Sequence, residues 1–172
     1  MQKISKSEYT EHWNCYHSKI FKEPWDSYDF ANEEWSKILF PYQILLSKKI
    51  ISKLQKVIVS NDAALAFSVD TIIDDAEIYT LKNVFQNWDD LSQSILAHFN
   101  VHIFDESQRW GLIVTTEGVT ILGGAKSLLQ SFVSEMGGEN NLLSDFDSAY
   151  KDQDLGEELM NEWKNWRTHF RF

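Results

Sequence analysis

The sequence has a single cysteine, two prolines and seven glycines among its 172 residues. Cys15 has no second cysteine to pair with in the chain, and without a Cys/His cluster no structural zinc site is expected. Because it stands among aromatic residues in a helical pattern, we expect a buried, inert thiol. The few glycines and prolines argue against any long low-complexity or disordered stretch.

Long apolar runs are also missing. No run approaches the ~20 apolar residues that a membrane-spanning helix needs. The N-terminus, Met-Gln-Lys-Ile-Ser-Lys-Ser-Glu, is polar and lacks the apolar stretch of a signal peptide. We therefore expect a cytoplasmic protein that does not contact a membrane.

Basic residues are scarce, with 16 Lys and Arg against 26 Asp and Glu, which gives a formal net charge of −10. This field repels a phosphate backbone, so direct binding of nucleic acid is not expected. The same field would attract a basic partner and speed its encounter with the protein. The alternative is that the charge serves solubility alone.

Aromatic residues, in contrast, are plentiful: they make up 14% of the chain, with 7 Trp and 11 Phe. Each ring buried removes ~150–250 Å² from water, so the chain can form a core as a single domain over residues 1–172. Since the rings exceed what such a core must hold, we expect some of them at the surface as binding anchors.

Helical spacing dominates the N-terminal part of the chain. The pattern predicts a helix from about Lys6 to Lys19, an aromatic loop over Phe21–Asn32, a short helix over Glu33–Leu39 and a helix over Pro41–Lys56. The last of these helices has four lysines and no acid. It is therefore expected to hold the one basic face of the molecule.

The middle of the chain reads as strands, and the C-terminal third as helices. Strands are predicted at Val57–Ser60, Leu65–Val69, Glu77–Leu81, Val101–Phe104, Gly111–Thr116 and Val119–Leu122, the last two joined by a two-residue turn at Glu117-Gly118. Helices are predicted from Asn87 or Asp89 to Phe99, over Ala125–Met136 up to Gly137-Gly138, and through the C-terminal third. This order predicts an α+β fold: a small antiparallel meander sheet packed by N-terminal and C-terminal helices.

No catalytic or cofactor motif is found. Gly123-Gly124 lies between a strand and a helix, but neither phosphate-binding pattern is present, and a tight turn explains both glycines. His12 and His17 are five residues apart, about 140° around a helix, which is unsuited to chelation. The other histidines, at 98, 102 and 169, are interpreted as structural or solvent-facing. We expect no enzyme activity, no cofactor and no metal.

Two acidic patches are the candidate binding residues. Nine acids and one base lie between Glu135 and Glu162, and a second patch follows the first predicted strands. A solvated helical face would have the same composition. The functional interpretation is a negative surface for a basic protein, with nearby rings such as Tyr79 and Phe146 as further anchors. The candidate residues are Asp74, Asp75, Glu77, Asp145, Asp147, Tyr150, Asp152 and Asp154.

The segment Trp-Gly-Leu-Ile-Val-Thr-Thr-Glu-Gly-Val-Thr-Ile-Leu-Gly-Gly that starts at Trp110, with the helix through Phe132, resembles immunity proteins of bacterial contact-dependent growth inhibition and other polymorphic toxin systems. The match covers about 25 residues and includes no catalytic residue. The resemblance implies a cytosolic antidote that binds one cognate toxin domain, often a basic nuclease, and blocks its active site.

Two alternatives stay open. A small cytosolic hydrolase or transferase would gather at least two titratable groups with shifted pKa values in a pocket. A protein-interaction adaptor could form homo-oligomers through exposed rings around Trp25, Tyr28 and Trp35, although a monomer is favoured.

Overall fold

The computed structural model describes residues 2–3, 6–12, 18–22, 29–41, 48–58, 63–68, 78–82, 89, 101–105, 107–115, 119–150, 157, 160–161 and 163–165. The strands in this part of the chain are β1 (Gln2–Lys3), β2 (Ser36–Pro41), β3 (Ala63–Ser68), β4 (Ile78–Lys82), β5 (Val101–Asp105), β6 (Trp110–Val114) and β7 (Val119–Gly124). The helices are α1 (Lys6–His12), α2 (Ser18–Ile20), α3 (Lys48–Val57), α5 (Lys126–Glu135) and α6 (Glu139–Tyr150).

All seven strands join one sheet in the order β1-β4-β3-β5-β6-β7-β2, and every neighbouring pair is antiparallel. Strands β5, β6 and β7 are consecutive in both sequence and space, as in a meander. Strand β2 precedes them in the chain but pairs with β7 at the sheet edge. The predicted α+β fold is confirmed.

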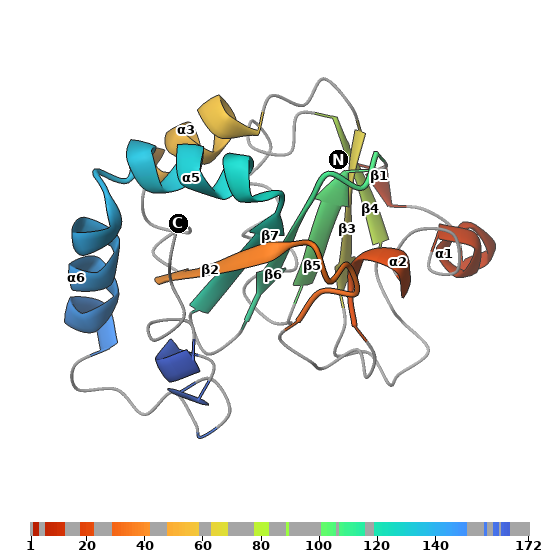
Figure 1. Cartoon of the computed structure of the whole chain (residues 1–172). Coiled ribbons are helices and arrows are strands. Elements are labelled where there is room, and N and C mark those ends of the chain that lie inside the picture. The colour runs from red at the N-terminus through yellow and green to blue at the C-terminus, as the bar shows by residue number, and fades with distance from the viewer. Residues whose placement is uncertain are drawn as a thin grey trace.

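Helices cover one face of the sheet, where α3 and α5 lie together, while α6 stands beside β2 (Figure 1). Phe40 of β2 and Thr120 of β7 are register partners, so their side chains share a face. The Phe40 ring packs on Phe132 of α5, with ring centroids 5.1 Å apart. This helix-covered face is completed by apolar side chains at helical spacing: Leu129, Phe132 and Val133 from α5, and Ile50 and Leu54 from α3.

The opposite face of the sheet is covered by two short stretches from the N-terminal part of the chain, residues 20–22 and 29–31, which we together call the aromatic arm. Its two stretches pair through a bridge between Phe21 and Phe30 and through an Ala31 N–H that donates to the Ile20 carbonyl at 2.8 Å. Both rings are buried on the sheet. Apart from Ile20, which ends α2, this arm lies within the predicted aromatic loop, and its rings belong to the core.

Glycines make room for the arm. A Cβ at Gly123 would lie 2.3 Å from the Phe30 ring, and a Cβ at Gly111 would lie 2.9 Å from the same ring. Gly111 and Gly123 are register partners on β6 and β7. Both positions are therefore occupied by glycine because a ring packs directly against the backbone, rather than because a tight turn needs them.

Three local predictions are wrong. Residues 36–39, predicted as part of a helix, form most of β2, where pairing with β7 over six residues supplies the backbone hydrogen bonds. Ile38, Leu39 and Phe40 are buried, so the strand shows no alternation that would identify it. Its terminal Pro41 is tolerated because β2 is an edge strand.

The second and third errors concern boundaries. Val57, predicted to open a strand, ends α3, and the Ile58 N–H still donates to the Leu54 carbonyl at 2.7 Å. β6 ends at Val114 and β7 begins at Val119, so four residues, 115–118, connect the two strands instead of two, and the Thr115 N–H donates to the Val119 carbonyl at 3.0 Å. The other predicted strands are confirmed to within two residues at β3, β4, β5, β6 and β7.

Apart from the helix predicted over Glu33–Leu39 and from Pro41, which lies in β2, the predicted helices agree with the described residues. α1 and α2 agree with the helix predicted from about Lys6 to Lys19, although α2 ends one residue later, at Ile20. α3 begins at Lys48, in the second half of the helix predicted over Pro41–Lys56, and α5 matches Ala125–Met136. Gly137 and Gly138 have φ of 91° and 96°, a left-handed conformation that ends α5. The helix predicted before Phe99 lies outside the described residues, apart from Asp89.

Candidate functional site

Helix α6 holds three of the predicted binding residues, Asp145, Asp147 and Tyr150. Asp145 and Asp147 are exposed, as is Glu139 in its first turn, and the helix contains no basic residue. Its inner side is fixed by Leu142 and Phe146, which are 0% and 1% exposed. The acids of α6 are thus presented to solvent on a firmly packed helix.

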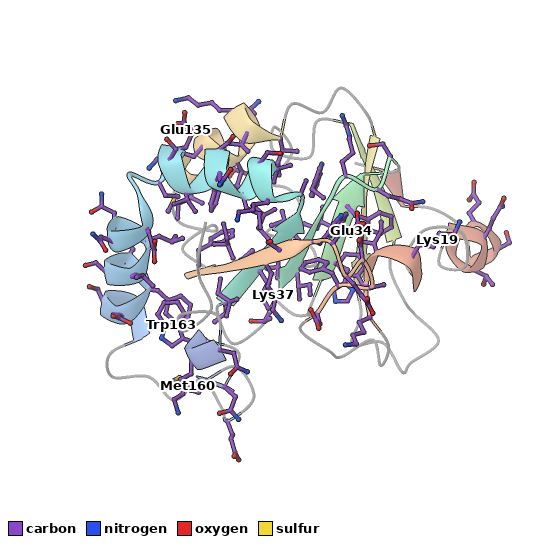
Figure 2. All side chains as sticks on the ribbon, in the orientation of Figure 1. Lys19, Glu34, Lys37, Glu135, Met160 and Trp163 are labelled. Carbon is purple, nitrogen blue, oxygen red and sulfur yellow. The ribbon has the colours of Figure 1, made fainter. Side chains whose placement is uncertain are left out.

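Phe146 is not an exposed anchor. Its ring stacks on Trp163 with centroids 3.7 Å apart and an interplanar angle of 11°. Trp163 is itself 5% exposed and packs against α6 from the C-terminal segment, next to Met160 (Figure 2). The sequence-based interpretation of Phe146 as a binding anchor is therefore wrong, because its ring is buried against Trp163 and cannot contact a partner.

Asp145 and Asp147 lie on the same helix but not on the same side of it. Residues two apart differ by about 200° around an α-helix, so the two carboxylates flank the outward side in opposite directions. Between them the outward side of α6 presents uncharged polar side chains: Asn140, Asn141, Ser144 and Ser148. A partner that contacts both carboxylates must therefore straddle the helix.

The side chains of the other six predicted residues are not described. Tyr150 is the last residue of α6, and its side chain is not among those described. Asp74, Asp75, Glu77, Asp152 and Asp154 lie outside the described residues. The structure therefore places two of the eight candidate side chains, on different sides of one helix, and leaves the others as predictions.

Sequence reasoning missed an open groove between the C-terminal end of α3 and the outward side of α5. Its volume is about 650 Å³, and its lining is Lys56, Val57, Ser127, Gln130, Ser131, Ser134 and Glu135. Lys56 Nζ donates to Glu135 Oε2 at 3.1 Å across the groove. The signal that could have revealed it is the absence of charge from Ser127 to Ser134, in a chain of which 24% is charged.

The groove is suited to hydrogen bonding. Its serine hydroxyls and the Gln130 amide are exposed, and the Ser131 hydroxyl donates to the Ser127 carbonyl at 3.0 Å. Its two titratable groups, Lys56 and Glu135, pair with each other and are 65% and 37% exposed. Such a surface can accept and donate hydrogen bonds to a polypeptide.

His102 is a core residue. It is 2% exposed and stacks on Phe21, with ring centroids 4.1 Å apart and an interplanar angle of 24°. This agrees with its interpretation as structural. The side chains of the other four histidines and Cys15 fall outside what the structure describes. Among the described residues, no group of three His, Cys, Asp or Glu side chains is placed to hold a metal ion.

Trp35, one of the three rings predicted as an oligomer contact, is half-buried. It packs on Phe30 of the aromatic arm with ring centroids 5.5 Å apart. Trp25 and Tyr28 lie outside the described residues.

Comparison of the chain with protein-family models, curated proteins and solved structures gave no match. In the described part of the chain, every helix is too short or too polar to cross a membrane.

Proposed function

We propose that this protein is an immunity protein: it binds a cognate toxin domain, a basic nuclease, in the cytoplasm and covers its active site. The observation that supports the proposal most directly is α6, which presents the carboxylates of Glu139, Asp145 and Asp147 to solvent while its inner side is fixed on the core. The resemblance of the segment from Trp110 to immunity proteins agrees with it.

The charge suits such a partner. A nuclease must bind a polyanion, so the surface around its active site is basic. A protein of net charge −10 is drawn to that surface over a distance of about a Debye length, ~8 Å at physiological salt. Steering of this kind raises the association rate and favours docking over the active site itself.

Rigidity suits the same role. Leu142 and Phe146 fix α6 before any partner arrives, so little conformational entropy is lost at these positions on binding. The groove over α5 adds uncharged hydrogen-bonding groups to the exposed surface. A partner segment can therefore be held by hydrogen bonds as well as by attraction between charges.

Coexpression tests the proposal. The C-terminal domain of the protein encoded immediately upstream is expressed alone and together with this chain. We expect arrested growth in the first case, normal growth in the second and a stoichiometric complex on copurification. An upstream protein without a toxic domain, or a toxic domain that this chain neither binds nor neutralises, would contradict the proposal.

Charge reversal then tests the contribution of α6. The double variant Asp145→Lys, Asp147→Lys changes the net charge from −10 to −6, since each substitution adds two charges. We expect the association rate at low salt to fall about 10-fold or more, with a smaller loss at high salt.

The matched control is Glu33→Lys, Glu34→Lys, which makes the same change in net charge at two exposed positions before β2. Figure 2 shows Glu34 well away from α6. If both double variants slow association equally, the effect belongs to net charge and α6 has no specific part in the interface.

A further inference from the structure

We draw no further inference here: the strongest candidate, the open groove between the C-terminal end of α3 and the outward side of α5, is lined by exposed small side chains and one ion pair, and nothing in the described part of the structure shows what covers it.

Discussion

The two faces of the sheet are covered in different ways. On the helix-covered face, side chains from α5 such as Phe132 meet side chains from the strands such as Phe40. On the other face, the Phe30 ring rests directly on the backbone of Gly111 and Gly123. The helix-covered face therefore depends on the volume of its side chains. The arm-covered face depends on the absence of side chains from two strand positions.

Truncation on the helix-covered face should have the largest effect. Phe132→Ala removes a ring that is 0% exposed and leaves a cavity between α5 and β2. We expect the free energy of unfolding to fall by about 3–5 kcal/mol, measured by urea or thermal denaturation.

The control is the neighbouring exposed residue, as Ser131→Ala, which should change stability by no more than about 0.5 kcal/mol. A loss below about 1 kcal/mol for Phe132→Ala would show that α5 is not firmly packed on the sheet.

Addition of a methyl group is the corresponding test of the arm-covered face. Gly123→Ala places a Cβ within 2.5 Å of three atoms of the Phe30 ring, so the arm must shift. We expect a loss of about 1–3 kcal/mol by the same denaturation measurements, as is usual for overpacking.

Double-mutant analysis identifies the cause of that loss. Phe30→Leu removes the ring that meets the new methyl group, so the pair Gly123→Ala, Phe30→Leu should be less destabilised than the sum of the two single variants, by at least about 0.5 kcal/mol. Additive losses would mean that Gly123 is needed for another reason, such as backbone conformation.

The difference between the faces also explains which part of the fold the sequence predicts. The helix-covered face is packed by α5, whose buried residues recur at helical spacing and which ends at two glycines. The bounds of this helix in the sequence therefore follow from pattern alone. The aromatic arm has no period. Its rings are ordered by contacts with β5, β6 and β7, which lie about eighty to ninety residues away in the chain.

The prediction of a helix at the position of strand β2 was wrong for a related reason. Its central residues are buried on both sides and pair with β7, so neither alternation nor local propensity distinguishes it from the short helix that was predicted. For the candidate site, charge showed that acids are abundant. It could not show that Phe146 is stacked on Trp163, because this contact follows from tertiary packing. The different directions of Asp145 and Asp147, in contrast, follow from their spacing of two on a helix.

Two buried threonines provide a test of polar groups inside the sheet. The Thr115 hydroxyl accepts from the Val119 N–H at 3.1 Å, while Thr120 Oγ1 has no hydrogen-bond partner among the described residues. We expect Thr115→Val to cost about 1–2 kcal/mol, since it leaves the Val119 N–H without that bond. Thr120→Val should instead raise stability by up to about 1 kcal/mol, because it removes a buried polar atom.

The two substitutions make the same chemical change, so each is the control for the other in thermal denaturation. Equal losses would mean that the Thr120 hydroxyl is bonded in solution, and the helix-covered face would then hold a polar contact that the structure does not show.

The smallest effects on stability should come from the ion pairs of the aromatic arm and of helix α5. On the arm, Asp29 pairs with Lys22 at 3.6 Å and with Lys37 at 3.3 Å, and the Lys37 side chain is only 23% exposed. On α5, Glu135 pairs with Lys56, which is 65% exposed. Asp29→Asn keeps an oxygen for the Phe30 N–H, which Asp29 Oδ1 accepts at 3.0 Å, but removes the charge.

We expect Asp29→Asn to cost about 0.5–1 kcal/mol and Glu135→Gln less than about 0.5 kcal/mol, because the less exposed lysine is less screened by water. Both losses should shrink in 1 M salt, where the Debye length is about 3 Å. Glu34→Gln, at an exposed acid without an ion pair among the described residues, is the control and should change nothing measurable. If Glu135→Gln lowers the free energy of unfolding more than Asp29→Asn does, the ion pairs of Asp29 contribute little to holding the aromatic arm. The arm must then be held on the sheet by the Phe21 and Phe30 rings.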